Sequence, residues 1–215
     1  MSKFNAGEYP AFNSEDLEIL DKTTVFQGFF RLDRYSLRHR LFAGGWSSPM
    51  QREVLERGHA VVVLPYDAVR DELVLIEQFR VGAAFGQRSP WLLEAIAGMV
   101  EPGEQAEQVA RREAEEEAGL TINELWPMLS YLSSPGGTTE RIQLFLGRLT
   151  EPVTTGIFGL AEEHEDIKVH LMKREQAMQL LAEQKIDNAA SVIALQWLAL
   201  NLDKVKAAWR EQGVA

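Results

Sequence analysis

The chain has 215 residues, of which 46% are hydrophobic and 25% charged, and its formal net charge is −10. This composition is that of an ordinary globular protein with a substantial core. The acidic balance argues against nucleic acid as a ligand, because a phosphate backbone binds best to a basic surface. A small phosphorylated ligand is compatible with it, since carboxylates can hold divalent cations that present positive charge to a phosphate.

Other features of the sequence exclude several locations and chemistries. No apolar run approaches the ~20 residues that a bilayer crossing needs. Residues 1–21 are polar and acidic where a signal peptide would be apolar. The absence of cysteine excludes disulfides, thiolate zinc sites and cysteine nucleophiles. We therefore expect a cytoplasmic protein that neither enters a membrane nor binds nucleic acid.

The first third of the chain favours antiparallel strands. Short runs alternate apolar and polar residues, and Gly44-Gly45 fits a turn between two of them. A sheet this small buries little apolar surface by itself, so we expect it to pack on the main domain or on a second chain. The runs are Thr24-Val25-Phe26, Phe29 to Tyr35 and Glu53 to Glu56.

From His59 onward the patterns predict a mixed α+β domain. A buried strand over residues 60–65 turns at 66–71 and returns as its hairpin partner over 72–80. Apolar runs predict further strands over 91–100, 125–132, 142–149 and 167–172. Helices are expected over 104–118, 174–184 and 189 to about 210, the first ending at a Gly119 cap.

The first expected helix carries a concentration of carboxylates. Glu113, Glu116 and Glu117 are spaced i, i+3 and i+4, so they share one face. Like charges at this spacing destabilise a bare helix by roughly 0.2–0.5 kcal/mol per pair. Oxygen ligands without Cys or His suit Mg²⁺ or Mn²⁺, and Arg112 is placed to hold the Glu116 carboxylate. The alternative is a solvated acidic helix face, the commoner role of a lone Glu-rich helix.

The residues around this helix form a longer ordered pattern. It runs from Gly98 through Glu104 and Arg112-Glu113 to Glu116-Glu117 and Gly119. This pattern resembles the complete signature of the Nudix hydrolases, which cleave a nucleoside diphosphate linked to another group. The resemblance implies an α/β/α sandwich around a mixed sheet, here with an N-terminal antiparallel β-rich extension.

The resemblance also implies the metal ligands. By position they are Glu113 and Glu117, with Glu116 assisting and the Ala97 carbonyl contributing, and they would hold two or three Mg²⁺ or Mn²⁺ ions. Four further segments resemble the bacterial ADP-ribose pyrophosphatases, and Pro135, sixteen residues after Gly119, supports this substrate class. The segments are residues 56–60, 77–80, 133–137 and 187–191.

In that group the general base lies on a loop well beyond the signature. The corresponding segment here is the acidic run over residues 159–166. By position Glu163 is the expected base and Glu165 a further metal ligand. The neighbouring Glu162 competes for the assignment of the base, and the alternative for the whole segment is an acidic surface loop.

Substrate contacts are expected away from the metal ligands. Arg80 could meet a phosphate or pair with a surface Glu, and Glu140 could accept a ribose hydroxyl or cap its loop. Phe29 and Phe30 could stack on adenine or pack in a core. The resemblance adds further expected contacts at Arg52, Glu53, Arg57, Ser134 and Gly136.

Together these features predict Mg²⁺-dependent hydrolysis of ADP-ribose to AMP and ribose 5-phosphate. The expected division is a β-rich dimerisation and substrate-contact region over residues 1–57 and a hydrolase domain over 58–215. The resemblance implies a homodimer that exchanges its N-terminal strands. The alternatives are a nucleotide-sugar pyrophosphatase acting on a compound such as GDP-mannose, and a sensor that binds ADP-ribose without cleaving it. The four histidines lack zinc-ligand spacing, so we expect structural roles for them.

Overall fold

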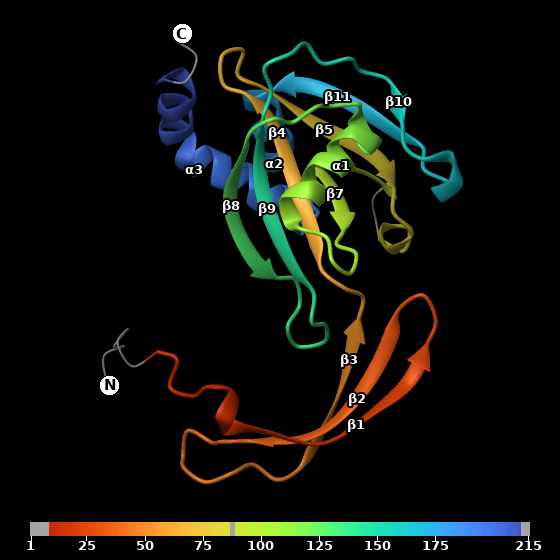
Figure 1. Cartoon of the computed structure of the whole chain (residues 1–215), viewed down its shortest axis with the longest axis vertical. Helices are drawn as coiled ribbons and strands as arrows, with labels where there is room; N and C mark the ends of the chain where they lie inside the picture. The colour runs from red at the N-terminus through yellow and green to blue at the C-terminus, as the bar shows by residue number, and fades with distance from the viewer. Residues whose placement is uncertain (1–8, 87–88, 212–215) are drawn as a thin grey trace. The chain divides into compact units, whose positions relative to one another are not determined.

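The computed structural model describes residues 9–86 and 89–211, and the chain divides into two compact units (Figure 1). The first unit comprises residues 1–57 together with 134–140, and the second comprises 58–133 together with 141–215. The loop 134–140 thus groups with the N-terminal region, although the strands on either side of it belong to the second unit.

The first unit is built on a three-stranded antiparallel sheet in the order β1-β2-β3. Gly44 and Gly45 both have left-handed backbone, with φ of 90° and 77°, and form the expected turn before β3. The expected antiparallel extension is therefore confirmed. Phe29 and Phe30, however, lie in the bend between the first two strands and not inside a strand as expected. The strands are β1 (Leu17–Gln27), β2 (Arg31–His39) and β3 (Met50–Glu56).

The buried residues of the first unit are acidic. In its described part only Asp33 and Glu140 are buried, while side chains such as Phe26, Phe29 and Phe42 are exposed. Asp33 accepts a hydrogen bond from Thr24 Oγ1 (2.7 Å) and pairs with basic neighbours, so its charge is compensated. Within its described residues the sheet has no buried apolar core of its own.

The second unit contains an eight-stranded mixed sheet. Six strands follow the order β10-β11-β5-β4-β9-β8, while β6 pairs with β5 and β7 with β4. The β4–β9 pair is parallel and the others are antiparallel. The strands are β4 (Ala60–Asp67), β5 (Glu72–Phe79), β6 (Trp91–Glu94), β7 (Ile96–Met99), β8 (Leu125–Leu132), β9 (Arg141–Arg148), β10 (Ile157–Phe158) and β11 (Ile167–Lys173).

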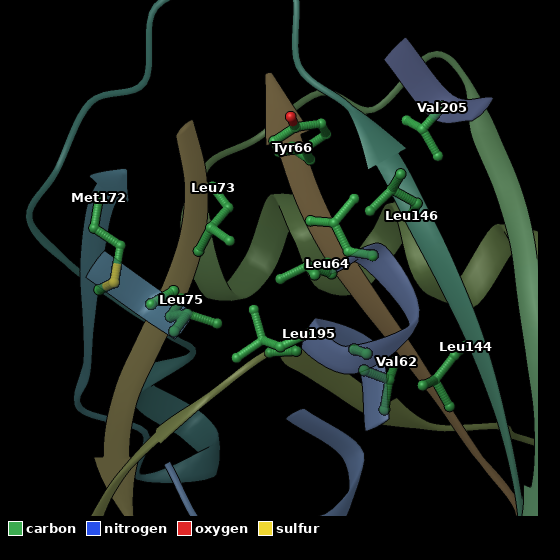
Figure 2. Close-up of a cluster of buried hydrophobic side chains, with 14 of the residues drawn as sticks. Val62, Leu64, Tyr66, Leu73, Leu75, Leu144, Leu146, Met172, Leu195 and Val205 are labelled. Carbon is green, nitrogen blue, oxygen red and sulfur yellow. The ribbon is translucent and has the colours of Figure 1, made fainter. Parts of the chain in front are cut away.

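Helices cover both faces of this sheet (Figure 1). Along β4, Val61 and Val63 pack with the apolar side of α1 (Ala106–Ala118). The alternate residues Val62 and Leu64 pack instead with α3 (Ala189–Glu211), and Leu195 of α3 lies among them in Figure 2. The helix α2 (Arg174–Ala182) joins the same layer. This alternation between two cores confirms the expected α/β/α sandwich.

The segment expected as one strand over residues 91–100 is two strands. The hairpin strands β4 and β5 pair only at Tyr66↔Leu73 and Asp67↔Glu72, beside their turn. Farther along, β6 pairs with β5 and β7 with β4, so the chain changes partner at Ala95. The apolar pattern does not reveal the break, because both halves are strands with the same period.

The helix α1 starts two residues later than expected. Gln105 is its N-cap, so Glu104 precedes the helix and does not lie within its first turn as predicted. Gly119, with φ of 62°, ends the helix as expected. Among the described helices, none is both long enough and apolar enough to cross a membrane.

Candidate active site

The carboxylate of Glu117 is buried between α1 and β7. Its side chain lies on the inner side of the helix with the core residues Ala114 and Ala118, and the residue is only 3% exposed. The backbone N–H of Ala97 donates a hydrogen bond to Glu117 Oε2 (3.1 Å). A buried carboxylate with few donors is costly unless a cation or further hydrogen bonds compensate its charge.

Gly98 leaves room for the second carboxylate. It pairs with Val61 of β4, whose side chain faces α1, so a side chain at position 98 would point toward the same helix. A Cβ atom added there would overlap the carboxylate of Glu113. The glycine therefore permits close approach of helix and strand, which gives a physical reason for the first residue of the signature.

Arg112 ties three carboxylates together. Its Nη1 lies 2.8 Å from Glu113 Oε1 and 2.9 Å from Glu116 Oε2, and its Nε lies 3.3 Å from Glu104 Oε1. These contacts confirm the expected pairing of Arg112 with Glu116 and add two more partners. A guanidinium shared in this way offsets the repulsion between acidic side chains on one helix face.

Burial and mutual repulsion raise the pKa of the two innermost carboxyl groups. Burial is the largest cause for Glu113, whose pKa is raised to about 7 although Arg112 opposes the shift. Burial likewise raises the pKa of Glu117 to about 8; the hydrogen bond from Ala97 opposes this, and the charges of Glu113 and Glu165 add to it. Raised pKa values of this kind mark a place where bound positive charge would be favourable.

The acidic loop over residues 159–166 approaches the same helix. The N–H of Gly159 donates to the carbonyl of Glu116 (3.3 Å), and Leu160 N–H donates to Glu165 Oε2 (3.1 Å). Gly159 has left-handed backbone, with φ of 103°, and an added Cβ would lie 2.7 Å from Glu165 Cβ. The glycine thus allows the loop to fold tightly beside α1.

The expected base is described only in part. The backbone of Glu163 closes the short 3₁₀ turn Ala161–Glu163, but its side chain lies outside the described residues. The competing Glu162 is exposed in the same turn.

The donor set has the chemistry of a hard-cation site. Within the described part of the chain, no three acidic or histidine side chains are gathered tightly enough to hold a metal ion together. The carboxylates of Glu113, Glu117 and Glu165 are held instead by Arg112 and by the N–H groups of Ala97 and Leu160. Hard oxygen donors of this kind fit Mg²⁺ or Mn²⁺, and the raised pKa values of Glu113 and Glu117 favour bound positive charge beside them.

Arg80 lies at the end of β5 and is held by a residue that the sequence analysis did not single out. Its Nε donates to Glu94 Oε2 (2.8 Å), and the Glu94 side chain is only 12% exposed. The charge of Arg80 also lowers the pKa of Glu117, so the two groups are near one another. A lone acidic residue inside the apolar run of residues 91–97 was the signal that could have revealed Glu94.

Three of the expected substrate contacts meet within the first unit. The Arg57 guanidinium lies over the ring of Phe30, 5.3 Å from its centroid, and Arg57 Nε lies 3.2 Å from Glu140 Oε1. Glu140 is buried, whereas Phe29 is 88% exposed and meets Phe30 edge to face. Next to them, Thr139 Oγ1 donates to Glu56 Oε2 (2.6 Å), which fastens the loop 134–140 to the end of β3.

The other expected contacts in this unit bond to residues of the same unit. Arg52 Nη1 donates to the Gln51 carbonyl (2.7 Å), and Glu53 pairs with Arg34 of the neighbouring strand (2.9 Å). The carbonyl of Ser134 accepts from Gly137 N–H (3.0 Å), and a Cβ added at Gly136 would meet open space. Arg52 and Gly136 thus leave free surface for a ligand, whereas Glu53 is engaged in an ion pair.

Two of the histidines have ordinary structural partners. His59 Nδ1 accepts from Arg141 N–H (3.2 Å), and His170 Nε2 lies 2.8 Å from Glu77 Oε2. These contacts agree with the structural roles that the sequence analysis expects.

The mixed sheet lies between two helical layers, and on one face the carboxylates of α1 pack beside Gly98 of β7. This combination of fold and site is that of a known family of proteins. The profile of the NUDIX domain family matches residues 56–196, and the chain belongs to this family.

The chain is also similar to individual proteins of known activity. The chain is 55% identical over 198 residues to the ADP-ribose pyrophosphatase of Escherichia coli (strain K12), covering 92% of this chain and 95% of that protein. It is 32% identical over 152 residues to the GDP-mannose pyrophosphatase of Escherichia coli O1:K1 / APEC, covering 70% and 78%. The solved structure of an ADP compounds hydrolase shares the fold, with a TM-score of 0.69, 23% identity and coverage of 88% and 95%.

Proposed function

We propose that this protein is a divalent-metal-dependent hydrolase that splits the diphosphate bond of ADP-ribose, yielding AMP and ribose 5-phosphate. The carboxylate face of α1, with Glu117 buried against the Ala97 amide, is the observation that carries the chemistry. The choice of ADP-ribose over GDP-mannose rests on similarity, because the chain is 55% identical to the pyrophosphatase named for the first compound and 32% to that named for the second.

The metal ligands proposed are the side chains of Glu113, Glu117 and Glu165 and the carbonyl of Ala97, with Glu116 assisting. Two or three Mg²⁺ or Mn²⁺ ions suit this number of hard oxygen donors. A bound ion supplies positive charge against the charge that develops on the phosphoryl oxygens, and it makes a nearby water more acidic. The role of Arg112 is to hold Glu116 and Glu113 in place, since it contacts both.

Glu163 is the proposed general base. It takes a proton from the attacking water as the new P–O bond forms in line with the bond that breaks. The second proton of the water stays on the phosphate that receives the oxygen, and the leaving phosphate departs as the other product.

The rest of the substrate is recognised by groups that lie away from the carboxylates. The terminal nitrogens of Arg80 bind a phosphate while its Nε stays on Glu94. In the first unit, the rings of Phe29 and Phe30 stack on adenine, and Glu140 accepts a ribose hydroxyl. Further contacts come from Arg52, Glu53, Arg57, Ser134 and Gly136.

A homodimer with exchanged N-terminal strands is the proposed assembly. Within the described part of the first unit only acidic residues are buried, while Ile19, Phe26 and Phe42 are exposed. A three-stranded sheet normally needs one face covered for stability, and a second chain can cover it. The cytoplasmic location expected from the sequence stays a prediction.

The direct test is turnover of ADP-ribose with and without Mg²⁺, beside GDP-mannose, NADH and diadenosine polyphosphates at equal metal concentration. We expect a clear preference for ADP-ribose that is lost with chelator. A preference for GDP-mannose would keep the metal site and overturn the assigned substrate. Binding of ADP-ribose without turnover of any compound would identify a sensor and overturn the catalytic proposal.

A further inference from the structure

We infer that Ser191 and Asn188, at the start of α3, are positioning residues for the metal site on the opposite face of the sheet. They fix Ala95 at the break between β6 and β7, and this break sets the position of the Ala97 amide that holds Glu117. The inference deepens the proposed function and rests on it, because it requires Glu117 to bind the metal.

The contacts of these two residues converge on the break between the strands. Ser191 is 1% exposed, and its Oγ accepts a hydrogen bond from Ala95 N–H (2.8 Å). Asn188 Nδ2 donates to the carbonyl of Leu93 (2.8 Å). The two residues are joined to one another, because Ser191 N–H donates to Asn188 Oδ1 (3.1 Å). The start of α3 thus binds both the Ala95 N–H and the Leu93 carbonyl. These groups lie where the chain stops pairing with β5 and begins to pair with β4.

This break needs an external anchor. Leu93 is the partner of Glu77 on β5, whereas Ile96 is already the partner of Val63 on β4. Ala95, between them, belongs to neither ladder, and its buried N–H finds its acceptor in Ser191. Leaving a buried N–H without an acceptor is unfavourable, so the segment would shift if the hydroxyl were lost.

The shift would reach Glu117 through two peptide units. The N–H of Val100 donates to the His59 carbonyl at the start of β4. Because amides alternate along a strand, Ala97 turns its N–H to the other edge of β7, where Glu117 Oε2 accepts it. The proposed ligand carbonyl of Ala97 belongs to the same residue. A change at Ala95 therefore moves both an expected ligand and the donor that orients another.

The experiment uses Mn²⁺ as the probe in the full-length protein. The variants are Ser191→Ala, which removes the acceptor of Ala95, and Asn188→Asp, which removes the donor to Leu93 but keeps the acceptor for Ser191. We expect each to weaken Mn²⁺ binding, measured by calorimetry, by about tenfold, the lower end of the effect of residues that orient metal ligands. We also expect faster hydrogen exchange of the Ala97 amide in the metal-free protein, measured by NMR.

Tyr66→Phe is the matched control. Tyr66 is fully buried in the same core as α3, and its hydroxyl donates to Asp71 Oδ1 (2.6 Å), so this change also deletes one hydroxyl and one hydrogen bond. We expect a comparable loss of thermal stability with unchanged Mn²⁺ affinity and unchanged exchange at Ala97.

Wild-type Mn²⁺ affinity in both Ser191→Ala and Asn188→Asp would overturn the inference and leave the proposed function standing. Equal weakening in Tyr66→Phe would also overturn it, since a general loss of stability would then suffice. Failure of the wild-type protein itself to bind Mn²⁺ would count against the proposed metal site, and the exchange rate of Ala97 would still decide whether the anchor positions this amide.

Discussion

Single side chains decide whether the carboxylates of α1 can approach the sheet. At Gly98 any side chain would overlap the Glu113 carboxylate, and the atoms displaced would be the flexible end of that side chain and not the backbone. Such a substitution therefore acts on the position of a proposed ligand more than on the fold.

Gly98→Ala should fold and lose function. We expect metal affinity to fall by about 10–100-fold, as when a group that orients a ligand is lost. Gly82→Ala is the matched control, because neither glycine has left-handed backbone and a Cβ at Gly82 meets nothing within 4 Å. The check is a titration of activity and of calorimetric heat with Mg²⁺. Equal metal affinities in the two variants would show that the space behind Glu113 is not needed.

Glu163→Gln tests the proposed base. The change keeps the size of the side chain and removes its ability to take a proton, so kcat for ADP-ribose should fall by about 10²–10⁴-fold. Metal affinity should change little. Glu162→Gln is the control from the same turn. If kcat falls in the control and not in Glu163→Gln, the base is Glu162.

At the scale of whole elements, Asp71 joins the β4–β5 turn to both C-terminal helices. Its carboxylate accepts hydrogen bonds from Tyr66 Oη (2.6 Å) and Arg174 Nε (3.0 Å), and Lys206 Nζ lies 3.3 Å away. The backbone adopts φ of 54°, which Asp and Asn tolerate better than most residues. Burial alone would raise the pKa of Asp71, but the hydrogen bonds and the charges of Arg174 and Lys206 lower it to about 2.

Asp71→Asn should destabilise the protein at neutral pH by roughly 1–3 kcal/mol, since hydrogen bonds to a charged acceptor are lost. The pKa of Asp71 is lowered in the folded state, so its stabilisation is fully present above the unfolded value of 3.8 and disappears as pH falls through about 2. The stability difference between variant and wild type should therefore be constant from pH 7 to 4 and shrink between pH 4 and 2. Urea unfolding across this range measures it.

Glu183→Gln provides the comparison for this test. Glu183 pairs with Lys185 at 2.8 Å, but both side chains are largely exposed. Solvent screens such a pair, so little change in stability is expected at any pH. A difference for Asp71→Asn that persists unchanged down to pH 2 would contradict the role of its charge.

The elements show how far the sequence could predict this fold. The apolar run of residues 60–65 and the helical spacing around Glu113 are local patterns, and the strand and the helix that they predict were both confirmed. The break at Ala95 could not be predicted from a local pattern, because the acceptor for its N–H is a hydroxyl ninety-six positions away in α3. The position of Glu104 before α1 was also missed: Gln105 is the N-cap of the helix, and the Glu104 carboxylate accepts a hydrogen bond from Glu101 N–H (3.0 Å).

The residues of the proposed site were predictable to different degrees. The carboxylates of α1 stand at fixed helical offsets, so their shared face follows from the chain alone. Glu94 was missed because a single acidic residue in a strand carries no period, and its meaning comes from Arg80 on the neighbouring strand. The meeting of Phe30, Arg57 and Glu140 depends on a loop that is distant in the sequence.

At the scale of the whole molecule, the expected substrate contacts and metal ligands are divided between the two units. The Phe30–Arg57–Glu140 group belongs to the first unit, and the carboxylates Glu113 and Glu117 belong to the second. In a dimer with exchanged strands, one complete site would draw its two parts from different chains.

Mixing two inactive variants tests this assembly. Arg57→Ala damages the first unit and Glu117→Gln the second. After both are unfolded and refolded together, about a quarter of wild-type activity should return, because half of the randomly paired dimers carry one intact site. Each variant refolded alone should stay inactive, and sedimentation should show a dimer. A fully active monomer, or no recovery in a dimer of the mixed chains, would contradict the exchange.

The loop 134–140 groups with the N-terminal sheet although it is encoded between two strands of the other unit. The first unit is therefore discontinuous in the sequence and consists of two separate segments. Truncation after residue 57 would separate Arg57 from the buried Glu140, and Glu56 from Thr139. The polar loop 134–140 would then remain in the second unit without the sheet that it contacts. Moving this unit onto another protein thus requires transferring both segments at once, because each bonds to the other.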